Sequence, residues 1–89
     1  MVKVYESHRR ETERVLANPN NRERCDWLND MVAWWGPAWD DERRRAKRNG
    51  YKMNARTRMS LESWRVCLRR VRRAADPEND MHCADVVGL

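Results

Sequence analysis

Phenylalanine is absent from this 89-residue chain, and glycine and proline occur only three times each. Low-complexity and linker-like compositions, which are rich in glycine and proline, are therefore excluded. No stretch of about 18 consecutive apolar residues is present, so we expect no segment that spans a membrane. The N-terminal residues lack the apolar core of a secretory signal, and we expect no such signal.

Cysteine is also scarce. Cys25, Cys67 and Cys83 are an odd number without the spacing of a disulfide framework, which predicts reduced thiols and a cytoplasmic location. With His8 and His82 they supply zinc-ligand types, but structural zinc sites use close pairs such as C-x2-4-C, and here only two adjacent residues are close. We predict no metal and no cofactor, and we expect the first two cysteines to be small core residues.

Signatures of catalysis are missing as well. The chain has no glycine-rich phosphate loop and no H-E-x-x-H motif. Cys83 stands beside His82, but a nucleophile of this kind also needs a third group that orients its base. The three acids at 40–42 are explained by a helix start, where the helix dipole favours negative charge. We therefore predict that the protein is not an enzyme and has no small-molecule substrate.

The hydrophobic pattern predicts an all-α fold, a small single-domain bundle of three to four helices. Apolar residues recur at helical spacing, and no alternating run bounded by turn signals supports a sheet. The predicted helices cover residues 4–17, 22–35, 37–49 and 60–75, and a tail at 76–89 follows, whose order is left open.

Turn-forming residues set the predicted boundaries. Pro19 disfavours a helical residue before it, and Asn20 or Asn21 can cap the next helix. Gly36–Pro37 is typical of one helix ending and another beginning. Asn49–Gly50 is expected to end the third helix.

The segment 60–75 is the clearest helix. Residues 51–59 before it show no strong period and are predicted to form a loop, with Thr57 or Ser60 capping the helix. The apolar stripe follows a 3-4-3-4 spacing and consists of Leu61, Trp64, Leu68, Val71 and Ala75. The other half of the helical wheel carries Arg65, Arg69, Arg70, Arg72 and Arg73.

Charge is distributed unevenly along the chain. Residues 1–42 hold six basic and nine acidic side chains, residues 43–73 hold thirteen basic and one acidic, and residues 74–89 hold four acidic and no basic. Sixteen of the nineteen cations are arginine. Its planar, bidentate guanidinium suits phosphate and carboxylate recognition, although a GC-rich genome would supply arginine codons equally well.

A central basic surface is the main candidate site. Like charges crowded on one helix cost stability, which indicates an anionic partner. Such a surface is typical of proteins that bind a phosphate backbone, and an acidic protein surface would attract it too. Besides the five arginines at 65–73, the predicted site comprises Arg43, Arg44, Arg45, Lys47, Arg48, Lys52, Arg56 and Arg58.

Two segments of this region, "ERRRAKR" at 42–48 and "NARTR" at 54–58, resemble in composition the arginine-rich RNA-binding peptides of phage antitermination proteins. The similarity covers a dozen residues in reversed order, and Asn49–Gly50 separates the two parts. It assigns the chain to no family.

Five tryptophans are many for a chain of this length. Trp35 and Trp64 lie on apolar stripes, and Trp39 is expected to close the corner between the second and third predicted helices. The apolar stripe of segment 22–35 consists of Cys25, Leu28, Val32 and Trp35. Trp27 and Trp34 lie beside this stripe, and we expect both in the core. If exposed, they would serve as anchors for a protein partner or as platforms for unpaired bases.

These features lead to two functional hypotheses. The first is a non-enzymatic, cytoplasmic regulator that binds RNA or DNA through the central arginines, and it expects Trp34 to be buried. The second is an inhibitor or adaptor of the phage or mobile-element type that docks on an acidic or nucleic-acid-binding surface of a host protein, and it expects Trp34 to be an exposed anchor. A homodimer formed through segment 22–35 is compatible with either.

Overall fold

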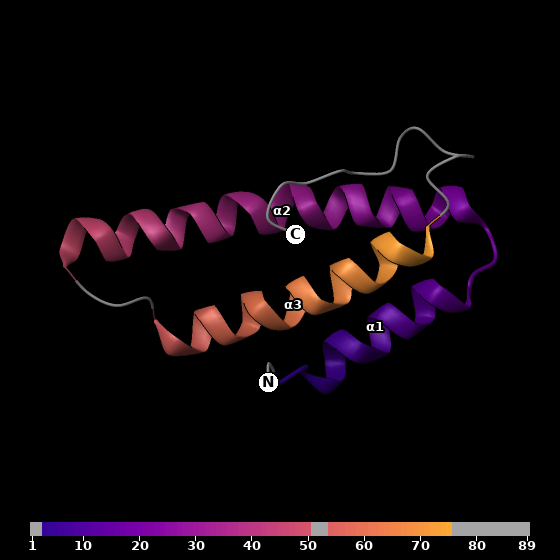
Figure 1. The fold of residues 1–89 in the computed structure, drawn as a ribbon, viewed down its shortest axis with the longest axis horizontal. Coiled ribbons are helices and arrows are strands. Elements are labelled where there is room, and N and C mark those ends of the chain that lie inside the picture. The colour runs from indigo at the N-terminus through magenta and orange to yellow at the C-terminus, as the bar shows by residue number, and fades with distance from the viewer. Residues whose placement is uncertain (1–2, 51–53, 76–89) are drawn as a thin grey trace.

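The computed structural model describes residues 3–50 and 54–75, so the predicted tail and Lys52 lie outside the described residues. It confirms the all-α bundle. The three helices are α1 (Glu6–Ala17), α2 (Asn21–Asn49) and α3 (Ala55–Ala74) (Figure 1).

The helices pack with α3 between α1 and α2 (Figure 1). Helices α1 and α3 run in the same direction, and α2 runs antiparallel to both. The 29 residues of α2 correspond to about 43 Å, whereas the 12 residues of α1 correspond to about 18 Å. Helix α1 therefore covers only part of the other two helices, and the end of α2 and the start of α3 extend beyond it.

The break predicted at Gly36–Pro37 is wrong, because α2 continues through it without interruption. A proline inside a helix removes one backbone hydrogen bond and crowds the carbonyl four residues earlier. Packing against α3 outweighs this cost. Leu28, Trp35 and Trp39 all lie on the core side of α2, and this side keeps its helical register across the proline.

The predicted loop at 51–59 is also too long, since α3 begins at Ala55. Asn54 rather than Thr57 or Ser60 caps the helix, and its side chain accepts a hydrogen bond from the Thr57 N–H at 3.2 Å. The Asn54 backbone N–H in turn donates to the buried carboxylate of Glu42 at 3.0 Å. This contact joins the last third of α2 to the start of α3, which begins five residues before the predicted position 60.

Other boundaries are confirmed. The Asn20 side chain caps α2 by accepting hydrogen bonds from the N–H groups of Arg22 and Glu23. Gly50 ends α2 with a φ of 65°, the left-handed conformation that glycine adopts without strain. Helix α1 begins two residues later than predicted and ends at Ala17 as predicted.

The core lies where the three helices meet. The indole N–H of Trp35 donates to the Leu61 carbonyl at 2.8 Å, which ties α2 to α3 inside the core. Cys25 and Cys67 are buried, as predicted. The principal buried cluster consists of Val15, Leu28, Trp35, Leu61, Leu68 and Val71.

One arginine closes the end of the bundle. The guanidinium of Arg24 donates to the carbonyl of Leu16 at 2.8 Å and to the carbonyl of Ala74 at 3.4 Å. These carbonyls belong to the last turns of α1 and α3. A cation at these C-termini is favoured by both helix dipoles, so Arg24 fixes the ends of α1 and α3 against the start of α2.

A buried histidine fixes the opposite end of α1. His8 stacks on Trp64 with ring centroids 3.9 Å apart, and its Nδ1 forms a 2.7 Å hydrogen bond with Ser63 Oγ. Ser63 Oγ also accepts the Tyr5 backbone N–H at 3.0 Å. Because the Ser63 side chain is completely buried, this serine–histidine pair has no access to a substrate, and we assign it a structural role.

The environment of His8 predicts a pH dependence of stability. Burial lowers the pKa of His8 below its ordinary value of 6.5. At pH values between the pKa of His8 in the folded chain and its pKa in the unfolded chain, the unfolded chain therefore binds more protons. The contribution of His8 to stability is fully present above pH 6.5 and decreases as the pH falls below it. Melting temperature measured against pH should show this slope, and His8→Gln should remove it.

A slope that persists in His8→Gln would contradict this assignment. The titration of the Glu6 and Glu11 carboxyls does not overlap with that of His8. Hydrogen bonds from Arg9 and Arg14, respectively, lower their pKa values below 4.5, so their effect lies at more acidic pH.

Candidate functional site

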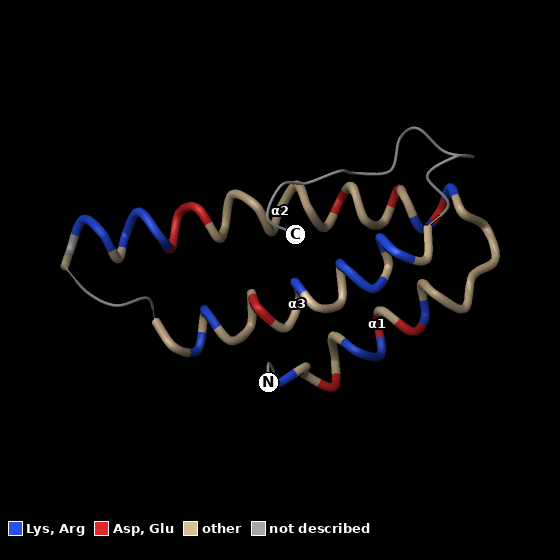
Figure 2. Tube along the Cα trace, viewed as in Figure 1, with Lys and Arg blue, Asp and Glu red and all other residues tan. Residues whose placement is uncertain are grey.

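The structure divides the predicted basic residues between two places. Arg43, Arg44, Arg45, Lys47 and Arg48 lie on the last turns of α2, in the part that extends beyond α1 (Figure 2). The others within the described residues lie along α3, and these are Arg56, Arg58, Arg65, Arg69, Arg70, Arg72 and Arg73.

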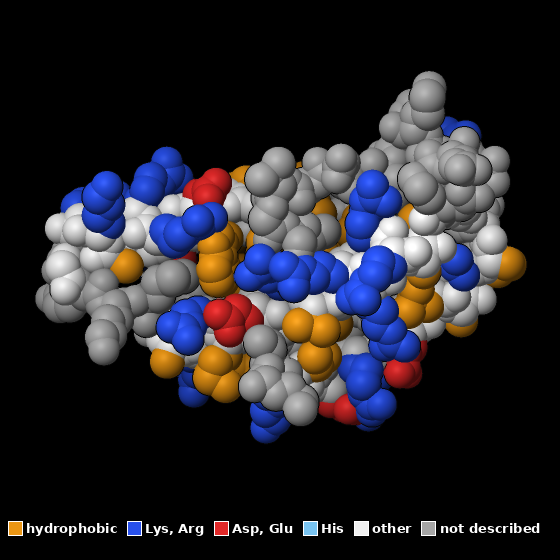
Figure 3. Space-filling model, in the orientation of Figure 1, with side chains coloured by type: hydrophobic (Ala, Val, Ile, Leu, Met, Phe, Trp, Pro, Cys, Tyr) orange, Lys and Arg blue, Asp and Glu red, His pale blue; other side chains and the backbone are white. Residues whose placement is uncertain are grey.

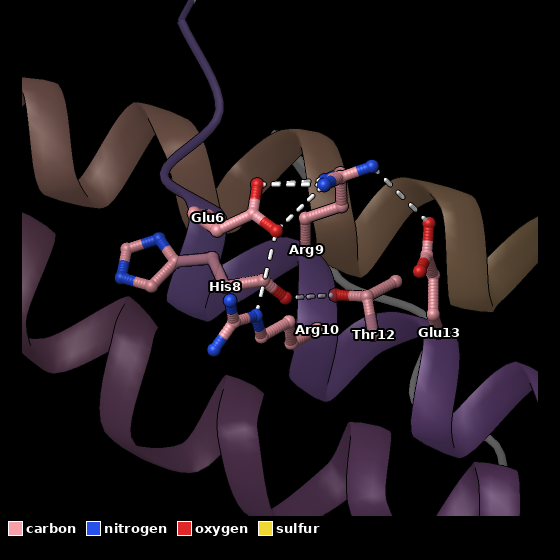
Figure 4. Close-up of polar contacts among 6 residues, drawn as sticks. All are labelled: Glu6, His8, Arg9, Arg10, Thr12 and Glu13. Atoms are coloured by element: carbon pink, nitrogen blue, oxygen red, sulfur yellow. Dashed lines mark hydrogen bonds and ion pairs between the residues drawn. The ribbon is translucent and has the colours of Figure 1, made fainter.

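The arginines of α1 provide an internal comparison, because the chain neutralises them. Arg9 forms an ion pair with Glu6 at 2.6 Å, and Arg10 contacts the same carboxylate at 3.4 Å (Figure 4). Arg14 pairs with Glu11 in the next turn. All these pairs have i,i+3 or i,i+4 spacing, so they stabilise the helix locally and leave little charge for a partner.

Three cations of the predicted site are neutralised in the same way. Each pairs with an acid on its own helix, so these arginines also contribute to local helix stability. Arg43 additionally lies over the ring of Trp39, 5.5 Å from its centroid. The pairs are Arg43–Asp40 at 3.0 Å, Arg45–Asp41 at 3.4 Å and Arg58–Glu62 at 3.4 Å.

Six further cations of the predicted site are exposed and form no ion pair with any residue that the structure describes. They are Arg44, Lys47, Arg48, Arg56, Arg70 and Arg73. Because their charge is not offset within the described part of the protein, they are the residues best suited to an anionic partner.

Two arginines of α3 are less exposed than predicted. Arg65 and Arg72 are half-buried, and the buried Nε of Arg65 has no hydrogen-bond partner among the residues that the structure describes. The sequence placed all five arginines of this helix on the half of the wheel away from the apolar stripe, and it did not anticipate the partial burial of these two. They lie next to the Leu61 and Leu68 side of α3, where the aliphatic part of arginine can cover the core.

The basic side chains form an extended surface. Arg56, Arg70 and Arg73 lie within about 100° of one another on α3 and span 17 residues, which corresponds to about 26 Å along the helix. Figure 3 shows cations along this length of the molecule and again at the end of α2, with apolar side chains between them. A linear array of this kind can follow a linear polyanion.

The two tryptophans proposed as anchors differ. Trp27 is half-buried, packs against the core and donates its indole N–H to Glu11 at 3.1 Å, as expected for a core residue. Trp34 is 50% exposed, so its predicted burial is wrong. Trp34 and Arg43 are nine residues apart, or about 900° of helical rotation, and therefore point to opposite sides of α2. Arg45 and Arg48, eleven and fourteen residues after Trp34, lie within about 20° and 40° of it, so Trp34 shares its side of α2 with these two cations and not with Arg43.

Residues that sequence reasoning missed are mainly polar groups in the core. Ser63 and Glu42 are buried and link elements. Glu42 lies about 20° from Trp35 on the helical wheel of α2, whereas Ser63 lies about 80° from the nearest residue of the apolar stripe of α3, so its burial had no such sequence signal. Met59, which was assigned to a loop, lies on α3 and is 44% exposed.

Neither a metal-binding cluster nor a membrane span occurs among the residues that the structure describes. Among the described residues, no three His, Cys, Asp or Glu side chains gather in a way that could hold a metal ion, and His82 and Cys83 lie outside those residues. Within the same part of the chain, every helix is too short or too polar to cross a bilayer. Comparisons with protein-family models, with curated proteins and with solved structures find no match to this chain.

Proposed function

We propose that this protein is a non-enzymatic cytoplasmic regulator that binds nucleic acid, with the arginines of α3 contacting the phosphate backbone. The observation that carries the proposal is a difference in ion pairing between the arginines of α1 and those of α3. The arginines of α1 are paired with glutamates, whereas Arg56, Arg70 and Arg73 of α3 are exposed and form no ion pair with a described residue.

The chemistry of the surface supports a polyphosphate partner. Guanidinium groups bind phosphate in a bidentate manner, and their contacts with a backbone release condensed counterions, which supplies most of the affinity. The exposed arginines of α3, Arg56, Arg70 and Arg73, extend over about 26 Å, which is long enough to meet several consecutive phosphates.

The test is binding of fluorescent oligonucleotides, single-stranded and duplex, measured by anisotropy at several salt concentrations. The logarithm of affinity should fall steeply with the logarithm of salt concentration. The variant Arg56→Gln/Arg70→Gln/Arg73→Gln should reduce the slope by about 2 to 3, because each lost phosphate contact contributes about 0.7 to 0.9. The affinity of this variant should fall to the same extent for oligonucleotides of every sequence.

The matched control is Arg9→Gln/Arg10→Gln/Arg14→Gln, which removes the same charge from α1. This variant should retain most of the affinity and nearly the full salt slope. Equal losses in both triple variants would show that net charge alone attracts the oligonucleotide. Absence of salt-dependent binding in the wild-type chain would refute the proposal.

The exposure of Trp34 favours a second candidate, a protein-binding inhibitor or adaptor. A half-exposed tryptophan is a frequent hot-spot residue in protein interfaces. Its neighbours at Glu23 and Asp30 would repel phosphate, so this surface is unsuited to nucleic acid. The exposure of Trp34 contradicts the burial that the nucleic-acid hypothesis expected and agrees with the exposed anchor that the second hypothesis expected.

A further inference from the structure

Positive charge is concentrated at the C-terminal end of α3 (Figure 2). After Glu62, which pairs with Arg58, the helix continues with five arginines and no acid. Arg70 and Arg73 are exposed and form no ion pair with any residue that the structure describes. Helix α1 places an acid three or four residues from each of its arginines, whereas this end of α3 contains none.

The chain leaves this end of α3 from a fixed point. Ala75 is buried, its backbone N–H donates to the Val71 carbonyl at 2.9 Å, and its φ of −71° and ψ of 138° are extended rather than helical. Pro77 follows and disfavours a helical residue before it. The guanidinium of Arg24 donates to the Ala74 carbonyl at 3.4 Å and offsets the negative end of the α3 dipole, which would otherwise repel acids placed next to it.

Three acids follow this point at alternate positions. They are Asp76, Glu78 and Asp80, and residues 76–89 contain no Lys or Arg that would compete for them. Alternate residues of an extended chain share one side and lie about 6.6 Å apart. Arg70 and Arg73 are separated by about 4.5 Å along α3, so two long guanidinium side chains can meet two neighbouring carboxylates of such a segment.

Distance selects the cations that these acids can reach. Residues 76–80 lie outside the described residues, but they are attached to Ala75, and five extended residues span at most about 18 Å. Arg73 and Arg70 lie about 3 and 7.5 Å before Ala75 along α3. Arg56 lies about 28 Å away, and the cations at the end of α2 lie near the start of α3, about 30 Å away.

We propose that the acidic segment 76–80 folds back onto Arg70 and Arg73 and competes there with the phosphate backbone. The competition rests on the proposed function, whereas the contact itself does not. Because the contact is intramolecular, the carboxylates act at an effective concentration of about millimolar. Exposed ion pairs are individually weak, so an oligonucleotide displaces the segment at a cost in affinity. Arg56 is out of reach and keeps its phosphate contact.

The contact is tested without nucleic acid, on the full chain after nuclease treatment. Each arginine Nε–H group gives its own NMR signal, which reports on the surroundings of that guanidinium. In the variant Glu78→Gln/Asp80→Asn, the Nε–H signals of Arg70 and Arg73 should shift by more than their linewidth. The shift should be the same at every protein concentration, because both partners belong to one chain.

Two controls separate a local contact from a general effect of charge. The signals of Arg44 and Arg48, which lie beyond the reach of the segment, should not move in the same variant. The matched variant Asp26→Asn/Asp30→Asn removes two exposed acids of α2 that form no ion pair with a described residue. It changes the net charge equally and should leave the α3 signals in place.

The competition is measured with the same two variants by fluorescence anisotropy of oligonucleotides. Glu78→Gln/Asp80→Asn should raise the affinity by about threefold to tenfold, the range expected when two exposed ion pairs no longer compete. Asp26→Asn/Asp30→Asn should raise it by less than about twofold at physiological salt, because distant exposed charges are screened.

The outcomes distinguish this inference from the proposed function. Unchanged Arg70 and Arg73 signals would overturn the contact, and so would equal shifts of the cations at the end of α2. Equal gains of affinity in the two variants would overturn the competition, because net charge alone would explain them. A chain that shows the shifts but binds no oligonucleotide would refute only the proposed function. A chain that binds with a steep salt dependence but shows no shift would refute only the contact.

Discussion

Trp35→Ala is expected to lower the free energy of unfolding by about 3 to 5 kcal/mol. Trp35 is only 4% exposed, packs in the principal buried cluster and stacks with Trp39 at a centroid distance of 5.9 Å. Its removal leaves a large cavity between α2 and α3, and the Leu61 carbonyl loses its hydrogen bond from the indole. Urea denaturation monitored by circular dichroism measures the change.

The neighbouring residue provides the control for this prediction. Trp34→Ala removes the same side chain one position earlier, where it is 50% exposed. We expect a change within about 0.5 kcal/mol at concentrations where the chain is monomeric. Similar losses of stability in the two variants would mean that the side of α2 that faces α3 is not the one that the structure shows.

Leu68→Ala should destabilise the fold by about 2 to 5 kcal/mol. Leu68 has no exposed surface and lies on α3, the helix that packs against both others. Neither α1 nor α2 can move into the cavity without losing its own contacts with α3, so the site should relax little. The midpoint and the slope of a urea transition together measure this change.

Met59→Ala is the matched variant on the same helix. Met59 is 44% exposed, so its truncation should change stability by no more than about 0.5 kcal/mol. A cost below about 1 kcal/mol for Leu68→Ala would contradict the central position of α3.

Part of the candidate site could be predicted from the sequence alone. The concentration of arginine at 43–73 is a property of composition, and helical periodicity placed Arg70 and Arg73 on the exposed side of α3. Pairing within one helix could also be anticipated for Asp41 and Arg45, because i,i+4 contacts depend only on local geometry.

The remaining features of the site required the tertiary structure. Half-burial of Arg65 and Arg72 results from the position of α3 between two helices, which widens its buried side beyond the apolar stripe. The exposure of Trp34 depends on how far α1 reaches along α2. Trp27 meets Glu11, whereas Trp34 lies two turns further along α2, where α1 begins.

Sequence by itself determined the helical class, an asparagine cap at position 20 or 21, the Gly50 terminus and the stripe from Leu61 to Val71, because these features arise from residues within one or two turns of each other. Only the tertiary structure decided that α2 passes through Pro37. A proline has a local cost that local rules count correctly, but the burial of Trp35 and Trp39 against α3 offsets it, and this burial comes from residues more than 20 positions away.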